Sequence, residues 1–337
     1  MANSPEIKYR NRRAFQIEDE DSRVTVTVEG GHIAEILHKA TGTNPLWSPP
    51  WSSIEPSRYN PAKYPEYGAN AESKLLAGIL GHSLCLDLFG PPSPEEEAAG
   101  ITTHGEASIV PYDITVHGRD MICQAYMPIA QLSIHRHIHL APGGTLHIIE
   151  TVENMSALDR ASAWTQHVTL GPPFLKNGVT QFCAPVKRSC TLEEREFEWP
   201  YLHCLDAHTE DLRVFTNAEP YGQVTTHLVD PSRMQGFFLA FSPESQILFG
   251  YTWERSDFPW LAIWDENCSR TAPPWNGRTL TRGLEFGASP LPETRRQMIL
   301  RQSLFETPGY RWLPAKTKVQ VKYLAFIRSS PHMPNAL

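Results

Sequence analysis

The segment RVTVTVEGGHIAEIL, residues 23–37, decides the fold class. Residues 23–29 alternate valine with polar side chains, so the valines share one face of an extended strand. The Gly30-Gly31 pair then interrupts the alternation, and a second apolar-rich run follows at residues 32–37. Two strand-like runs joined through paired glycines are typical of a β-hairpin.

Further strand-like runs follow along the chain, whereas helical periodicity is scarce. They cover residues 131–140, 145–152, 236–241, 246–251, 260–264 and 318–327, and an Ala-Pro-Gly-Gly turn joins the first two. The 337 residues include 29 prolines, well above the usual share of about 5%. Since proline is poorly tolerated inside helices and central strands, this count favours short elements joined by rigid loops. The sequence therefore predicts an all-β fold.

Two stretches are predicted to be long loops. Residues 44–70 are crowded with Pro, Trp and Tyr, and residues 91–103 carry three consecutive glutamates at 95–97, expected on a solvated face or at a helix start. Loops of this length are uncommon unless they line a site. The length allows two smaller domains, but we expect one decorated sandwich over residues 1–337, with a core from about 24 to 327.

Charge and cysteine usage exclude several classes of partner. The chain has 30 Lys and Arg against 37 Asp and Glu, a net charge of −7, which argues against binding a phosphate backbone. It contains no apolar run near the roughly 18 residues of a membrane span and no apolar leader, so we expect a cytoplasmic protein. The six cysteines form no close C-x-x-C pair, so we expect reduced, buried thiols and no metal site. Monomer and homodimer both remain open.

Two histidines stand in segments that could carry chemistry. His104 lies in THGEAS, directly after the second long loop, and His167 lies in WTQHVTLGPPFL, where a strand runs into a Gly-Pro-Pro turn. Imidazole is the side chain best matched to proton transfer near neutral pH. The alternatives are a turn-capping role for His104 and a structural core position for His167.

A glutamate near the C-terminus is the third candidate. Glu285 stands between apolar Leu284 and Phe286, so it is either exposed on a strand or lines an apolar cleft. In a cleft, a carboxylate has a raised pKa and can act as a base. Arg278 and Arg282 could bind an acidic or phosphorylated sugar in the same cleft; the alternative is a surface salt bridge.

Three histidines on one predicted strand are spaced too far apart to form a metal site. His135, His137 and His139 alternate along one strand, so neighbouring imidazoles sit about 6–7 Å apart on one face. This is too far for all three to bind one ion, and the polar solvent face of a sheet is the better account.

Two histidines and one glutamate on separate strands, in a chain with nine tryptophans, suit a sugar site. Trp rings such as Trp264 offer flat apolar faces, while imidazoles and carboxylates bind hydroxyls and move protons. We therefore expect a small-molecule sugar as the partner.

The order of these motifs resembles the aldose 1-epimerase (galactose mutarotase-like) superfamily. The hairpin is followed by His104-Gly105, by TVEN at 151–154, by QHVTLGPPFL at 166–175 and by Gly283-Leu284-Glu285. The resemblance spans residues from about 24 to 327. It implies one large antiparallel β-supersandwich with a sugar on its concave face.

The resemblance also implies roles. Glu285 would take the proton from the anomeric hydroxyl, His167 would protonate the ring oxygen, and His104 would hold or polarise the sugar, with no cofactor. The arginine that relatives carry before the His-Gly motif is absent, and His82 or Asp87 would take its place. Trp264 and Arg282 complete the expected substrate contacts, and Asp206 and Asp230 are candidates for a hydroxyl-binding aspartate.

The sequence thus favours an isomerase that interconverts sugar anomers by ring opening and reclosure. A non-catalytic carbohydrate-binding protein is one alternative. Hydrolysis or elimination in the same cleft is another, because one fold hosts several chemistries. The identity of the sugar stays open.

Overall fold

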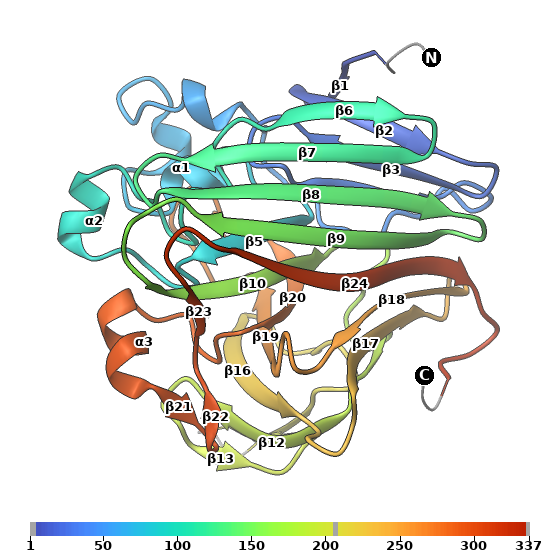
Figure 1. Ribbon diagram of the computed structural model, residues 1–337. Helices are drawn as coiled ribbons and strands as arrows, with labels where there is room; N and C mark the ends of the chain where they lie inside the picture. Colours follow the sequence, from blue (N-terminus) through green and yellow to red (C-terminus); the bar gives the residue numbers. More distant parts are fainter. Residues whose placement is uncertain (1–4, 205–207, 335–337) are drawn as a thin grey trace.

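The computed structural model describes residues 5–204 and 208–334 of the chain. Strands dominate this part of the chain and form two large sheets that face each other, while the few short helices lie to one side (Figure 1). Within the described residues, no helix has the length and apolar character needed to cross a membrane.

The larger sheet contains twelve of the described strands. They are β1 (Ile7–Tyr9), β2 (Arg12–Glu18), β3 (Ser22–Thr27), β4 (Ile33–His38), β5 (His82–Asp87), β10 (Arg160–Leu170), β12 (Val186–Thr191), β13 (Glu196–Phe197), β16 (Tyr221–Val229), β19 (Trp260–Asn267), β20 (Leu280–Gly287) and β23 (Arg311–Leu313). The order is β1-β2-β3-β4-β5-β10-β20-β19-β16-β12-β13, and β23 pairs with one end of β10. Strands far apart in the sequence therefore become neighbours at β5, β10, β20 and β19.

The second sheet has eight of the described strands. They are β6 (Asp113–His117), β7 (Asp120–Met127), β8 (Leu132–Ala141), β9 (Thr145–Asn154), β11 (Gln181–Cys183), β17 (Gln235–Ser242), β18 (Ile247–Glu254) and β24 (Lys318–Ser329). Their order is β11-β17-β18-β24-β9-β8-β7-β6.

Small elements complete the described structure. Two pairs of short strands are β14 (Tyr201–His203) with β15 (Thr209–Asp211), and β21 (Ser303–Leu304) with β22 (Thr307–Pro308). The helices are α1 (Ser73–Leu76), α2 (Pro94–Ala98) and α3 (Arg295–Arg301), with 3-10 turns η1 (Pro56–Arg58) and η2 (Pro65–Tyr67).

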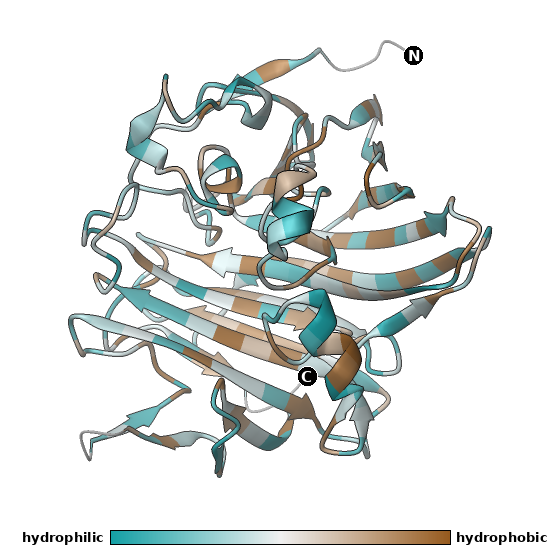
Figure 2. Ribbon diagram, turned by 90° about the vertical axis from the view of Figure 1, so that its left-hand side faces the viewer, coloured by the Kyte–Doolittle hydropathy of each residue, from teal (hydrophilic) through white to brown (hydrophobic). Residues whose placement is uncertain are grey.

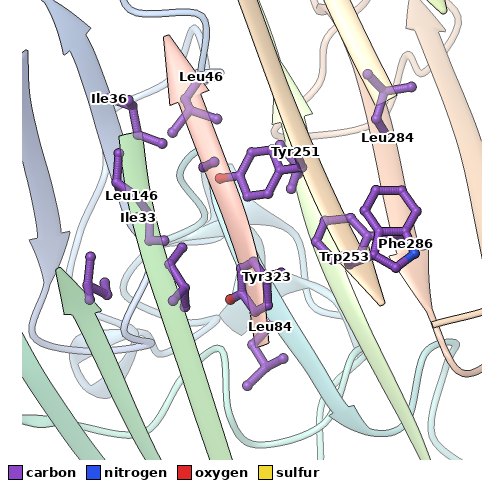
Figure 3. Close-up of a cluster of buried hydrophobic side chains, with 14 of the residues drawn as sticks. Ile33, Ile36, Leu46, Leu84, Leu146, Tyr251, Trp253, Leu284, Phe286 and Tyr323 are labelled. Atoms are coloured by element: carbon purple, nitrogen blue, oxygen red, sulfur yellow. The ribbon is translucent and has the colours of Figure 1, made fainter. Parts of the chain in front are cut away.

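The main hydrophobic core lies between the two sheets. One buried cluster joins residues of the larger sheet, such as Ile36 and Phe286, to residues of the smaller sheet, such as Tyr251 and Tyr323 (Figure 3). Trp253 stacks on Phe286 with ring centroids 4.1 Å apart. Burial of apolar surface on this scale is the main force that holds the sheets together.

The central strands of the larger sheet are buried on both faces. The face toward the smaller sheet, here called the inner face, carries the apolar core, as Leu284 and Phe286 show on β20. The opposite face, here called the outer face, is covered by the loops that follow β4, β5 and β19 and by the segment containing α3, with Trp47, Leu75 and Trp275 among the packed side chains. Helices α2 and α3 lie on the side presented in Figure 2.

The predicted all-β fold is confirmed, and so are its principal strands. The hairpin of residues 23–37 is β3 and β4, with Gly30 and Gly31 at positive φ between them. The six other predicted runs are β8, β9, β17, β18, β19 and β24. The glutamates at 95–97 start helix α2, where Ser93 and Glu96 form a capping box.

Candidate active site

Strand pairing brings two candidate residues that are far apart in the sequence side by side. In the antiparallel pair of β10 and β20, His167 lies directly opposite Glu285. Their side chains project from the outer face, because Val168, Leu284 and Phe286 beside them point into the core. Sheet register alone thus brings together two residues that are 118 positions apart in the sequence.

His167 and Glu285 contact each other directly. Nε2 of His167 lies 3.1 Å from Oε1 of Glu285, and both side chains are about 95% buried. Nδ1 of His167 lies 2.9 Å from the hydroxyl of buried Thr169 on the same strand. The imidazole is therefore held at both nitrogens, with one of them aimed at the carboxyl group.

His104 reaches the same place from the loop after β5. It has φ = 69°, and its ring centroid lies 4.9 Å from that of His167 in an edge-to-face arrangement. Nδ1 of His104 donates a hydrogen bond of 2.7 Å to the carbonyl oxygen of Phe89. Because a carbonyl only accepts, Nδ1 carries the hydrogen and the lone pair of Nε2 is left to accept one.

The three residues line one hollow, here called the central cavity, with a volume of about 150 Å³. A cavity of this size holds a single six-membered ring. Trp264 forms part of the wall, with its ring centroid 5.9 Å from that of His167, and Trp275 stands edge-on to Trp264 at 5.8 Å. The central cavity thus combines an aromatic wall with three groups that bind or move protons.

An arginine lies over the mouth of the central cavity. The guanidinium of Arg270 sits 5.3 Å from the ring centroid of Trp264 and 4.7 Å from that of Trp275. It also lies 3.5 Å from a carboxylate oxygen of Glu72 and 3.7 Å from one of Glu266. Because two carboxylates flank the one cation, the mouth carries no excess positive charge.

Burial pushes both members of the contacting pair toward their uncharged forms. Desolvation raises the pKa of Glu285 to about 8, with Arg270 opposing the shift. Desolvation, followed by the neighbouring His104, lowers the pKa of His167 well below its ordinary 6.5. The pair therefore holds one shared proton near neutral pH. Burial likewise lowers the pKa of His104 to about 4, so that ring is neutral.

His82 lies elsewhere than the sequence suggested. It points from the inner face of β5 into the core, where it is completely buried. Its Nδ1 lies 3.0 Å from the hydroxyl of Tyr251, and its Nε2 lies 2.9 Å from Oε1 of Gln166. The expectation that His82 binds substrate is corrected, because both of its ring nitrogens are used inside the sandwich.

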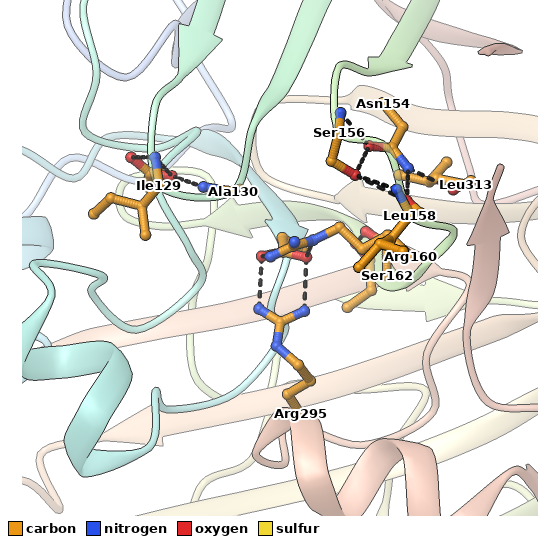
Figure 4. A network of polar contacts seen from close by, with 12 residues as sticks. Ile129, Ala130, Asn154, Ser156, Leu158, Arg160, Ser162, Arg295 and Leu313 are labelled. Carbon is orange, nitrogen blue, oxygen red and sulfur yellow. Dashed lines mark hydrogen bonds and ion pairs between the residues drawn. The ribbon is translucent and has the colours of Figure 1, made fainter. Parts of the chain in front are cut away.

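Asp87 is a clamp between structural elements and not a wall of the central cavity. Its carboxylate accepts pairs of hydrogen bonds from Arg160 and from Arg295, with the contacts to Arg295 at 2.6 and 2.7 Å (Figure 4). These arginines tie the end of β5 to β10 and to α3. The substrate-binding expectation for Asp87 is corrected, since two guanidiniums occupy both of its oxygens.

Arg282 also projects from the inner face. It forms a buried bidentate ion pair with Asp265 at 2.6 and 2.7 Å and lies 4.3 Å from the ring centroid of Phe182. Its predicted substrate contact is corrected, and so is the surface salt bridge that was the alternative. Arg278 is exposed outside the central cavity.

Asp230 also lies away from the central cavity. Asp230 follows the end of β16 and accepts hydrogen bonds from Ser232, and Asp206 lies outside the described residues. His137 and His139 share Asp120 on the solvent side of β8. No group of three or more His, Cys, Asp or Glu in residues 5–204 and 208–334 is arranged to hold a metal ion.

The lining residues that were not predicted from the sequence include Glu72, Arg270 and Trp275. Arg270 and Trp275 lie in the connection between β19 and β20, the two strands that carry Trp264 and Glu285. A loop that joins two strands with site residues lies close to one end of that site. This connectivity is the sequence signal that could have identified both residues.

Gly283 gives Glu285 its position. A Cβ atom at residue 283 would lie 2.2 Å from Oε1 of Glu285, so we expect Gly283→Ala to displace the carboxylate. Displacement of a catalytic group by about 1 Å can cost roughly 10²-fold in rate. Any activity that uses Glu285 should therefore fall by a factor of this order in kcat/KM.

Gly309→Ala is the matched control for this prediction, because the added Cβ would meet no atom closer than 3.5 Å. An unchanged kcat/KM in a folded Gly283→Ala protein would contradict the assigned position of Glu285.

Comparison with known proteins supports the fold. A protein of Klebsiella pneumoniae described as a "putative aldose 1-epimerase" has a TM-score of 0.70 at 14% identity, over 95% of this chain and 80% of its own. A galactose mutarotase-like protein of Clostridium acetobutylicum has a TM-score of 0.61 at 11% identity, over 96% and 98%. A galactose mutarotase related enzyme of Lactobacillus acidophilus has a TM-score of 0.60 at 11% identity, over 96% and 100%. No protein-family model and no curated protein sequence matches the chain.

Proposed function

We propose that this chain, which has the galactose mutarotase-like fold, is an aldose 1-epimerase-like isomerase that interconverts the anomers of a sugar. The observation that carries the proposal is the contact of 3.1 Å between Nε2 of His167 and Oε1 of Glu285 in a cavity of single-ring size. An acid and a base that share one proton can act on two oxygens of the same carbon without a cofactor.

The reaction follows from the shared proton. In the neutral pair the proton lies on Glu285, and its transfer to Nε2 of His167 across the contact of 3.1 Å gives a carboxylate and an imidazolium. The carboxylate of Glu285 then removes the hydrogen of the anomeric hydroxyl as the hydroxyl oxygen forms a carbonyl. The bond between the anomeric carbon and the ring oxygen breaks, its electron pair stays on the ring oxygen, and Nε2 of His167 protonates that oxygen. The open aldehyde rotates about its bond to carbon 2. Reversal of both proton transfers on the other face of the carbonyl gives the other anomer.

The neighbours of the pair have binding roles in this scheme. His104 accepts a hydrogen bond from a sugar hydroxyl through Nε2, since its Nδ1 is committed to Phe89. Trp264 supports the apolar face of the ring. Thr169 holds the imidazole of His167 in place through Nδ1.

The test is polarimetry with freshly dissolved single anomers of glucose, galactose, mannose and xylose. We expect the enzyme to accelerate the approach to anomeric equilibrium for at least one of them. Tight sugar binding in calorimetry without acceleration would support a carbohydrate-binding protein instead, and release of nitrophenol from nitrophenyl glycosides would support hydrolysis.

From pH 7 upward, the rate should fall along one alkaline limb. The working pair carries one proton, and this proton is lost as pH rises through the raised pKa of Glu285, about 8. We expect kcat/KM to be level near pH 7 and to fall about tenfold per unit above pH 8. The second proton binds only well below 6.5, the ordinary pKa of His167, so the acid limb lies lower. A kcat/KM that rises steadily from pH 7 to 9, after subtraction of the spontaneous rate, would contradict the shared proton.

A further inference from the structure

A second hollow adjoins the central cavity on the outer face. It has a volume of about 300 Å³ and shares Val224, Trp264 and Arg270 with the central cavity. We call it the outer groove. It is also lined by Leu192, Glu193, Gly222, Gln223, Glu266 and Ser269. Its lining residues come from β16, from β19 with the loop that follows it, and from the segment after β12; strands β16 and β12 lie in the lower part of Figure 1.

The geometry of the central cavity fixes which end of a sugar faces the outer groove. Glu285 and His167, which act on the anomeric carbon, are only 4% exposed and form the inner end. The guanidinium-bearing side chain of Arg270 is 42% exposed and marks the mouth. The central cavity has room for about one ring, and Val224, Trp264 and Arg270 are the residues across which a group attached to that ring reaches the outer groove.

The lining of the outer groove suits a second sugar ring. Leu192 is 42% exposed, although large apolar side chains are usually covered, and Val224 is half-buried beside it. Together with Trp264 they are the apolar members of the lining, to which Glu193 and Gln223 add polar groups. A lining that combines apolar and polar side chains is the arrangement that binds the two kinds of surface on a pyranose.

We propose that the outer groove binds the second unit of a reducing disaccharide or longer saccharide, whose reducing end occupies the central cavity. This inference rests on the proposed function and names its substrate class: an uncharged saccharide of at least two units with a free anomeric hydroxyl. The flanking of Arg270 by Glu72 and Glu266 agrees with an uncharged substrate.

The experiment compares substrates that share a reducing end. Anomer interconversion is measured for glucose against maltose, cellobiose and lactose, all of which end in glucose, and for galactose against galactobiose. We expect kcat/KM for at least one disaccharide to exceed that of its own reducing-end monosaccharide by tenfold or more. The gain should lie mainly in KM, because the second ring contributes binding that is equal in ground and transition states.

Two variants connect that gain to the outer groove. Leu192→Ala and Gln223→Ala change side chains that line the outer groove and not the central cavity. Combined, they should lower kcat/KM for the preferred disaccharide at least fivefold and leave the monosaccharide rate unchanged. Leu158→Ala, at a leucine 77% exposed outside both hollows, is the matched control and should change neither rate.

The outcomes separate this inference from the proposed function. Turnover of monosaccharides with no disaccharide preferred, or an equal loss on both substrate classes in the variant, overturns the outer groove as a sugar site and leaves the isomerase intact. No acceleration with any saccharide overturns both.

Discussion

Glu285→Gln is expected to lower kcat/KM for anomer interconversion by about 10²–10⁴-fold, the usual contribution of a general base. Glutamine keeps the shape of the side chain and can still hydrogen-bond to Nε2 of His167. In the wild-type protein this nitrogen lies 3.1 Å from Oε1 of Glu285. It has no basic oxygen to accept the anomeric proton, so the loss is chemical and not steric. Polarimetry with the preferred sugar measures it, and Glu35→Gln, at a buried glutamate of β4 paired with Arg23, is the control.

The same substitution should stabilise the protein at alkaline pH. Burial raises the pKa of Glu285 to about 8, so the folded state favours the protonated carboxyl more than the unfolded chain does. The stability from this group is fully present below its ordinary pKa of 4.5 and is lost as pH rises through 8. Glutamine does not titrate, so Glu285→Gln should raise Tm more at pH 9 than at pH 5. An inactive variant that is also less stable at pH 9 would indicate that Glu285 has a structural role.

His167→Ala is expected to have the second large effect, again about 10²–10⁴-fold in kcat/KM, because it removes the acid that protonates the ring oxygen. It also leaves the carboxyl of Glu285 without its partner. The kcat/KM of the combined His167→Ala/Glu285→Gln variant should lie within a few-fold of that of the less active single variant, since the effects of residues that act as a unit are non-additive.

His227 provides a matched control for this histidine. It is completely buried in the same sheet, and its Nε2 lies 2.9 Å from the hydroxyl of Thr225, much as Nδ1 of His167 contacts Thr169. It does not line the central cavity. His227→Ala should lower Tm but leave kcat/KM within about twofold of wild type. Equal kinetic losses in both variants would assign the effect of His167 to folding.

The fold was predictable because several of its hairpins show a clear alternation of apolar and polar residues in the sequence. The valines of residues 23–29 alternate with polar side chains, and β8 and β9 alternate in the same way around a glycine turn. Strands β10 and β20 are different, since they are buried on almost every residue of both faces. Their sequences therefore carry little period-2 signal, and the pairing of His167 with Glu285 could not be read from them.

The errors at Arg282 and His82 have one physical origin, the parity of a strand, whereas Asp87 is taken up by Arg160 and Arg295. Adjacent residues point to opposite faces, so a site on the outer face at Glu285 includes Gly283 and excludes Arg282. The prediction that His82 binds substrate was wrong for the same reason, because His82 lies on the inner face with Leu84. The alternation of side chains along the strand, counted from Glu285, would have excluded Arg282 from the candidate site residues without the structure. Arg270 could have been found from its position in the connection between β19 and β20, the strands that carry Trp264 and Glu285.

The most direct test of the central claim is magnetisation exchange between the two anomeric carbons of a 13C1-labelled sugar at equilibrium, measured by NMR with wild-type protein. The sugar is the one that the protein handles fastest in polarimetry. If Glu285 and His167 open and reclose the ring, exchange cross-peaks between the anomers will grow in proportion to protein concentration and return to the protein-free level with Glu285→Gln. Exchange at the protein-free level with wild type, or undiminished exchange with the variant, would contradict the account.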